Sequence, residues 1–218
     1  MKVFNVRLYV LALASMLCAS VWAGTPETEG NAVNEEVKSH RVLVLSAMDN
    51  VTSNYFVTDM LAENTNIKED SVCYIYNKVI EDNLSAIAKK AKSPYCFVDG
   101  NQQANADKLL ENVRTVGENE NKSSDLAFVN AGELKNLLAD AGADYLLLLD
   151  AHYLKYQEQP FKTIFHYVNY SLYDANKKKL AHGSNYFTSI NPQTEDQMLK
   201  SSKKSTAKML DLVEQTLK

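Results

Sequence analysis

Apolar and polar residues alternate with a period of two over much of the C-terminal half of the chain. The stretch 145–156 opens with an apolar run of four leucines, as in a central strand that is buried on both faces. The stretches 164–173 and 180–190 alternate as half-buried strands do. The polar connection 174–179 contains Asp and Asn, which favour turns. This pattern predicts a three-stranded antiparallel meander.

Elsewhere, apolar residues recur at spacings of three and four, which predicts amphipathic helices. Pro94 ends the first of these helices, and Gly142 is a suitable terminator for the third. Short apolar runs at 41–46 and 95–98 predict two further strands. The helical spacing covers four segments: 74–92, 107–116, 131–141 and 194–217.

The segment 49–70 leaves two interpretations open. It fits a short helix capped by Ser53, and it fits an irregular or extended segment equally well. The order of the other elements predicts an α+β fold. We expect a mixed sheet with a three-stranded C-terminal antiparallel meander, helices packed on the sheet and a long C-terminal helix. Residues 41–218 are expected to form a single α+β domain.

The first 23 residues have the composition of a secretory signal peptide. Lys2 and Arg7 precede an apolar run, and small residues mark a cleavage site between Ala23 and Gly24. The apolar run is shorter than the roughly 20 residues that a membrane span needs. We therefore expect an exported protein, periplasmic or secreted, with no transmembrane span in the mature chain.

A polar, acidic segment, 24–40, follows the cleavage site and is typical of a flexible lead. Bacterial lipoproteins are cleaved before a cysteine that carries lipid, and Cys18 is the one candidate. The residue before it is the bulky Leu17, whereas lipoprotein cleavage requires a small residue there. We therefore expect no lipid anchor at Cys18.

The charge of the chain argues against nucleic-acid binding. Removal of the signal peptide lowers the 23 basic residues to 21 against 27 acidic ones, so the formal net charge changes from −4 to −6. Nucleic-acid phosphates require a basic face. The lysines at 177–179 and 203–204 form only short clusters. We expect no nucleic-acid partner.

Two cysteines, Cys73 and Cys96, remain in the mature chain. An even pair in an oxidising compartment can form a disulfide. A predicted helix separates the two residues and spans roughly 25 Å, so a bridge requires the chain to double back before Cys73. The alternative is two separate thiols.

The sequence contains no recognised catalytic, cofactor or metal motif. No nucleophile elbow, phosphate-binding loop or dinucleotide fingerprint occurs, and the four histidines show no metal-ligand spacing. We therefore expect no catalytic, cofactor-binding or metal-binding residue. An unrecognised enzyme site near Asp150, His152 and His166 is the alternative, and the hairpin register decides whether both histidines share a face.

Tyrosines are concentrated in the predicted meander. Tyrosine combines a large apolar ring with a polar tip and is frequent at binding surfaces. We expect Tyr153, Tyr167 and Tyr173 to point outward and to form a surface for a protein partner, or for a glycan or small ligand. The alternative is that the tyrosines are ordinary strand residues covered by the last helix.

Two short motifs carry a resemblance to a known group of proteins. The segment 137–145 places Ala-Gly-Ala-Asp-Tyr after a helix, and the segment 172–180 contains Tyr-Asp-Ala-Asn before a lysine run. Both resemble small periplasmic domains of Gram-negative bacteria. These include the N-terminal domain of the Tol–Pal propeller protein, the curli secretion lipoprotein and lipoprotein activators of penicillin-binding proteins. Here Lys177 or Lys178 stands where the turn glycine is usual, and no convincing lipidation cysteine is present.

The resemblance implies a protein that binds other proteins or assembles at the cell envelope, although neither motif supplies a partner-binding residue. Our hypothesis is an exported, non-enzymatic binding or assembly module of the bacterial envelope with a protein partner. A secreted enzyme and a soluble glycan or small-ligand binder are the alternatives.

Overall fold

The computed structural model describes residues 39–218. The predicted signal peptide, its cleavage site at Ala23 and Gly24, and Cys18 lie outside these residues. The main sheet has the strand order β3-β1-β6-β7-β8. These strands are β3 (Tyr95–Asp99), β1 (His40–Ser46), β6 (Tyr145–Gln157), β7 (Thr163–Asp174) and β8 (Lys179–Ser189).

The sheet is mixed, as predicted. β1 runs parallel to both β3 and β6, while β6, β7 and β8 form the antiparallel meander. The short strand β2 (Val51–Ser53) continues along the edge of β6 beyond β1 and pairs with His152–Leu154. The α+β prediction is therefore confirmed.

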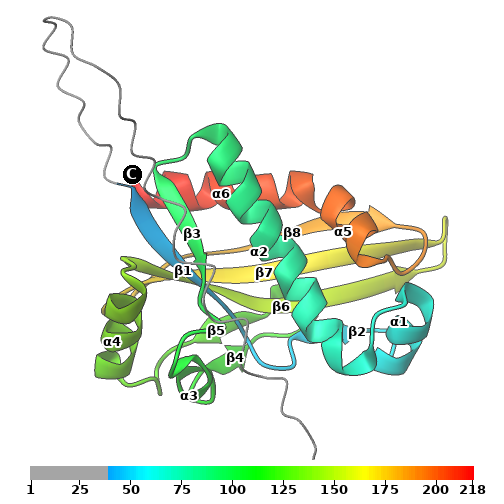
Figure 1. Ribbon diagram of the computed structural model, residues 1–218. Coiled ribbons are helices and arrows are strands. Elements are labelled where there is room, and N and C mark those ends of the chain that lie inside the picture. The colour runs from blue at the N-terminus through cyan, green and yellow to red at the C-terminus, as the bar shows by residue number, and fades with distance from the viewer. Residues whose placement is uncertain (1–38) are drawn as a thin grey trace, which may run out of the picture. The chain divides into compact units, whose positions relative to one another are not determined.

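Helices cover one face of the sheet, which we call the helical face. α2 (Val72–Ala91) crosses the strands, and α5 (Glu195–Ser201) and α6 (Lys203–Leu217) pack against it in the same layer (Figure 1). Leu147, Leu149, Tyr170 and Leu172 of the sheet join residues of α2 and α6 in one buried core. α1 (Thr58–Thr65) and the 3-10 turn Glu69–Ser71 extend this layer.

Among the described residues, the opposite face is covered over the parallel strands and the adjoining part of the meander. α3 (Ala106–Leu110) and α4 (Ala131–Ala141) pack there on the parallel strands. Beside them lie the antiparallel strands β4 (Arg114–Val116) and β5 (Ser123–Asp125), joined by the 3-10 turn η2 (Asn119–Asn121). The second core contains Leu43, Leu45, Leu146, Leu148 and Tyr173 from the sheet.

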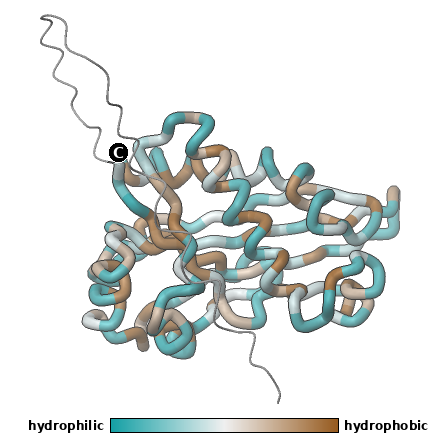
Figure 2. Tube along the Cα trace, viewed as in Figure 1, coloured by the Kyte–Doolittle hydropathy of each residue, from teal (hydrophilic) through white to brown (hydrophobic). Residues whose placement is uncertain are grey.

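Local sequence signals account for the better predicted elements. The Asn130 side chain caps α4 by accepting a hydrogen bond from the Gly132 amide, and Gly142 ends the helix at φ 60°. Along the helices, the colour in Figure 2 changes repeatedly between brown and teal, as expected for amphipathic segments with one buried side.

The helix predicted over 107–116 is wrong in its second half. α3 ends at Leu110, and Arg114–Val116 is the strand β4. Thr115 and Val116 are β-branched, which favours strand pairing over helix. The segment 117–125, for which no helix or strand was predicted, contains η2 and β5.

The single helix predicted over 194–217 is two helices, separated at Ser202. The Ser202 hydroxyl donates to the carbonyl of Met198 at 2.7 Å and accepts a hydrogen bond from Asn83 Nδ2 of α2 at 2.9 Å. This tertiary contact fixes the junction, and no local pattern in the sequence could reveal it.

The segment 49–70, for which a short helix and an extended segment were both predicted as alternatives, contains a strand and a helix. β2 comes first and α1 begins at Thr58, with Val57 rather than Ser53 at its N-cap position. The Ser53 hydroxyl instead accepts hydrogen bonds from the amides of Tyr55 and Phe56, at 3.1 and 3.0 Å. It therefore stabilises the turn that leaves β2.

A β-bulge interrupts β6 at Asp150, where the pairing with β7 shifts between Leu149 and Ala151. A bulge adds one residue to a strand and reorients its side chains. Leu149 belongs to the core of the helical face, whereas Asp150 bonds to residues of the opposite face.

Within 39–218, no helix combines the length and the apolar composition that crossing a membrane requires.

Candidate binding face of the sheet

Four aromatic side chains form a continuous group on the opposite face of the meander. Tyr153 of β6 pairs with Tyr167 of β7, which pairs with Tyr186 of β8, and Phe165 lies two residues before Tyr167. Ring centroids are 6.4 Å apart for Tyr153 and Tyr167, and 5.4 Å for Tyr167 and Tyr186. Phe165 lies 6.3 Å from Tyr167 and 5.7 Å from Tyr186. We call these four residues the aromatic face.

The covering layer on this side ends at η2. The carbonyl of Asn119 accepts a hydrogen bond from Asn169 Nδ2 at 3.2 Å, and Glu120 forms a 2.9 Å salt bridge with Lys155 of β6. Tyr153 lies beside this pair and is buried. Phe165 and Tyr167 are half-buried, while Tyr186 is 55% exposed. Three of the four rings are therefore accessible.

The predicted outward position of Tyr173 is wrong, because its side chain is only 1% exposed. Its hydroxyl donates to the carbonyl of Ser124 in β5 at 2.5 Å, and burial raises the pKa of Tyr173. Lys179 also donates to the Ser124 carbonyl. β5 covers this tyrosine, and the sequence pattern predicts no strand there, so the burial of Tyr173 could not be foreseen.

Tyr153 is also buried, contrary to prediction, whereas Tyr167 does lie on the accessible part of the sheet. Sequence reasoning did not select Phe165 or Tyr186 for this surface. The period-two alternation contained the signal, because Phe165, Tyr167 and the residues paired with them must share one face. The missing information was which half of that face remains uncovered.

Asp150, His152 and His166 do not form a common site. The two Asp150 carboxylate oxygens accept hydrogen bonds from the hydroxyls of Ser124 and Ser171 on the opposite face, the latter at 2.6 Å. His152 and His166 share a face, but it is the helical one, since their β-partners are Val168 and Leu154. The sheet therefore separates the carboxylate from both imidazoles.

Burial dominates the electrostatics of Asp150. Desolvation raises its pKa to about 6, although the hydrogen bonds from Ser124 and Ser171 and the positive charge of Lys179 act in the opposite direction. Both serines are fully buried. The hydrogen bonds of this cluster join β5 to the middle of the meander, so they give Asp150 a structural role.

His152 belongs to a buried polar network that joins three elements. Its Nε2 lies 2.9 Å from Asn77 Oδ1 in α2, and Asn77 and Asn50 exchange two hydrogen bonds, both 2.9 Å. Since amide oxygen only accepts, His152 Nε2 carries the proton. Burial lowers the pKa of His152 to about 3, so its imidazole is neutral at pH 7.

A small crevice lies where β1 and β3 end, with a cavity of about 180 Å³. Ligands often bind at the carboxyl ends of parallel strands, which draws attention to it. Glu81 accepts hydrogen bonds there from Ser46 at 3.0 Å and Asn101 at 2.8 Å, and burial raises its pKa to about 7. These bonds position the Glu81 carboxyl group. Lys78 and Cys73 also line the crevice, but Lys78 forms its salt bridge with Asp82, at 2.9 Å.

Of the two alternatives for Cys73 and Cys96, the structure has the separate thiols, because both residues are free. Cys73 lies in the first turn of α2, and Cys96 lies in β3, beyond the other end of that helix. The 20 residues of α2 span about 30 Å, so the helix itself separates the thiols. Cys96 is exposed rather than buried.

Within residues 39–218, no group of three or more histidine, cysteine, aspartate or glutamate side chains is arranged to hold a metal ion. His166 illustrates why the histidines do not provide one. Its Nε2 lies 2.8 Å from the Ser189 hydroxyl and its ring stacks on Phe187, so the side chain belongs to the packing of the helical face.

Comparisons with known proteins give little further information. No protein-family model matches the chain, and no curated protein matches its sequence. Among solved structures, a hypothetical protein of Chlamydia trachomatis is 10% identical with a TM-score of 0.48, over 81% of this chain and 96% of that one.

Two further solved structures are similar. A lipoprotein of Neisseria meningitidis is 13% identical, with a TM-score of 0.31 over 82% of this chain and 94% of its own. The C-terminal domain of LpoB from Salmonella enterica is 12% identical, with a TM-score of 0.25 over 70% and 85%. At such values, none of these structures shows which family the chain belongs to. The resemblance to periplasmic domains stays an expectation from sequence motifs.

Proposed function

We propose that this protein is an exported, non-enzymatic binding module of the bacterial cell envelope, and that its aromatic face holds an extended segment of a partner protein. The observation that carries the proposal is the group of Phe165, Tyr167 and Tyr186, left accessible on the part of the opposite face that α3, α4 and β5 do not cover. Clustered aromatic rings are typical anchors of protein interfaces.

The edge of the sheet supports an extended partner segment. β8 is the terminal strand of the main sheet and pairs only with β7 among the described residues. An added strand can therefore hydrogen-bond to the free side of β8, as in other cases of strand addition. Alternate side chains of that strand would then contact Tyr186, whose ring packs on Tyr167 of β7.

The buried groups favour binding over catalysis. Asp150 is bonded to two buried serines, and His152 to Asn77, on opposite faces of the sheet. Each has a structural explanation, and none of them contributes to the aromatic face.

Export is inferred from the predicted signal peptide alone, and the intact mass of the mature protein should correspond to a chain that begins at Gly24.

Site-specific photo-crosslinking in the native host tests the proposal. A photoreactive phenylalanine analogue replaces Tyr186, and a matched control carries it at Tyr55, which is 56% exposed but lies outside the aromatic face. We expect a discrete protein adduct from position 186, decreased at least about tenfold by Tyr167→Ala, and no such adduct from position 55.

Three outcomes would contradict the proposal. The absence of any adduct from position 186, at normal protein levels, would show that the aromatic face has no protein partner. Equal adducts from positions 186 and 55 would show that labelling follows exposure rather than a specific surface. An adduct with carbohydrate instead of protein would show that the aromatic face binds a glycan, and would overturn the assignment of a protein partner.

A further inference from the structure

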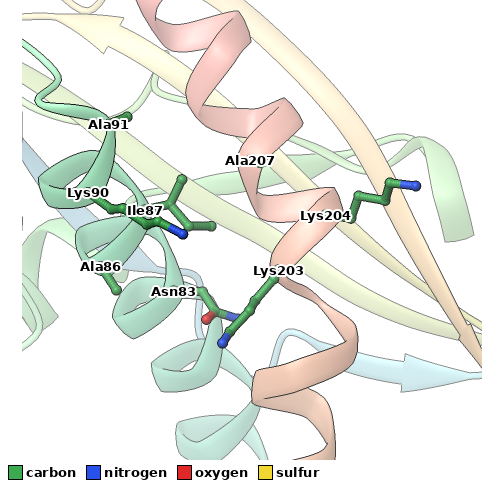
Figure 3. Close-up of a pocket in the computed structure, with 8 residues that line it drawn as sticks. All are labelled: Asn83, Ala86, Ile87, Lys90, Ala91, Lys203, Lys204 and Ala207. Atoms are coloured by element: carbon green, nitrogen blue, oxygen red, sulfur yellow. The ribbon is translucent and has the colours of Figure 1, made fainter.

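A groove lies between α2 and α6, on the outer side of the helical layer (Figure 3). Its cavity measures about 600 Å³. Small and aliphatic side chains form its floor: Ala86, Ile87 and Ala91 from α2, and Ala207 from α6. Because three of these four are alanines, another backbone can approach the two helices closely.

Lysines border this apolar floor. Lys90 of α2 and Lys203 of α6 line the cavity, and Lys203 extends toward Asn83 in Figure 3, while Lys204 points away from α2. Among the described residues, none that lines the cavity is acidic. Within the described part of the chain, neither Lys90 nor Lys203 forms a salt bridge. Both cations are therefore available to an external anion.

The position of Lys203 is unfavourable for the isolated fold, whereas Lys90 lies in the last turn of α2, where the helix dipole favours a cation. The first turn of α6 contains Lys203 and Lys204 and no acidic residue. The helix dipole favours acidic side chains at this end and disfavours cations. The whole chain has a formal charge of −4, so a local excess of cations runs against its composition. A local conflict of this kind is expected where function selects the residues.

The walls of the groove are held in place at both ends. Near its start, Asn83 Nδ2 donates to the Leu199 carbonyl and to the Ser202 hydroxyl, both at 2.9 Å. At the other end, the Tyr95 hydroxyl donates to the carbonyl of Leu217 at 2.9 Å. Such fixed walls lower the entropic cost of binding.

We propose that the groove between α2 and α6 binds an acidic amphipathic helix of a partner protein. The apolar side of such a helix would pack on Ile87 and the alanines, as ridges pack into grooves between helices. Its acidic flanks would meet Lys90 and Lys203. Opposite charges of this kind determine the orientation of the helix and accelerate association.

A protein helix fits the groove better than a membrane surface does. Membrane-surface binding needs large apolar side chains that enter the lipid. The large exposed apolar residues of the described chain, among them Tyr74, Phe161 and Ile190, do not line the groove. Alanine side chains can form the floor of a groove for a helix, but they provide little apolar surface that could insert into lipid.

The groove is independent of the proposed aromatic face. Its walls belong to the helical layer, whereas Tyr167 and Tyr186 lie on the other side of the sheet. Loss of binding at one surface should leave the other intact.

The test uses the full chain in its native host, with a photoreactive residue at the exposed Ala91. The crosslinked partner peptide is then identified by mass spectrometry. We expect an adduct within an amphipathic helical segment of net negative charge. Lys90→Glu with Lys203→Glu should decrease the adduct at least about tenfold. Lys68→Glu with Lys135→Glu, which makes the same charge change at two exposed lysines elsewhere, should retain it.

A second variant separates shape from charge. Ala207→Trp fills the groove without changing charge, and it should also abolish the adduct while circular dichroism shows unchanged folding. The proposal is wrong if the adduct contains only lipid, if it maps to a basic or non-helical segment, or if both double lysine variants behave alike. Absence of an adduct from position 91 would equally overturn it.

Discussion

The imidazole of His166 stacks on the ring of Phe187, with centroids 4.5 Å apart and ring planes inclined by 7°. Its Nε2 lies 2.8 Å from the Ser189 hydroxyl, which itself donates to the carbonyl of Asn191, so Nε2 carries the proton. The other ring nitrogen, Nδ1, is buried and has no hydrogen-bond partner. Protonation would therefore place an uncompensated charge inside the helical layer.

The buried histidine predicts a loss of stability in acid. Burial lowers the pKa of His166 from 6.5 to about 4, so the unfolded chain binds more protons between these values. The free energy of unfolding attributable to this group should fall as pH decreases from about 6.5 to 4, by roughly 3 kcal/mol in total. His166→Leu should remove this part of the pH dependence in urea unfolding.

His182→Leu provides the control, because His182 is an exposed histidine on β8. A His166→Leu variant whose stability declines between pH 6.5 and 4 as steeply as that of the parent would show that His166 is not the group responsible.

Asp150 should have the opposite dependence on pH. Its pKa is raised from 3.8 to about 6, so the folded protein holds a proton that the unfolded chain has released. Its contribution to stability is lost as pH rises from about 4 to about 6, on the order of 2–3 kcal/mol. Asp150→Asn should abolish this decline, since the amide is neutral at every pH and can still bond to Ser124 and Ser171.

Asp150→Ala distinguishes charge from hydrogen bonding. It leaves the buried hydroxyls of Ser124 and Ser171 without their acceptor, which should cost about 2–3 kcal/mol at all pH values. Asp140→Asn, at an exposed position of α4, controls for loss of a carboxylate. Equal stability of the Asn and Ala variants at pH 8 would contradict the role of the two serines.

The sequence predicted the elements whose signals are local. The α4 segment has a buried leucine stripe, an Asn cap and a terminating glycine, so its bounds agree with Ala131–Ala141. The meander likewise follows from period-two alternation, and its hairpin between β7 and β8 forms at the predicted polar connection. Lys177 there adopts φ 65°, the conformation for which glycine is usual in the resembling proteins.

Features that depend on distant contacts could not be predicted. The break at Ser202 rests on a hydrogen bond from Asn83, which is 119 residues away in sequence. The burial of Tyr173 depends on where β5 docks, and the opposite orientations of Asp150 and His152 depend on a bulge. The sequence therefore predicted that tyrosines of the meander form a surface, but of the three residues it named only Tyr167 is accessible there.

Close packing at Gly183 provides a stringent test of the β7–β8 register. Gly183 of β8 pairs with Tyr170 of β7, and a Cβ atom at position 183 would lie 2.5 Å from the Tyr170 hydroxyl oxygen and 2.6 Å from the adjoining ring carbon. The Tyr170 ring is buried and its hydroxyl accepts a hydrogen bond from Asn185 at 3.0 Å, so it has little room to move. Gly183→Ala should therefore lower the free energy of unfolding by about 1–3 kcal/mol.

A double-mutant cycle shows whether Tyr170 is the cause. In a Tyr170→Leu background the obstructing ring is absent, so Gly183→Ala should cost much less, with a coupling energy of about 1 kcal/mol or more in urea unfolding. Gly132→Ala is the control, since its Cβ would meet only Asn130 Oδ1, at 3.1 Å, and alanine is favoured in a helix. Additive effects of the two substitutions would mean that Gly183 does not face Tyr170, and the pairing of β7 with β8 would then have a different register.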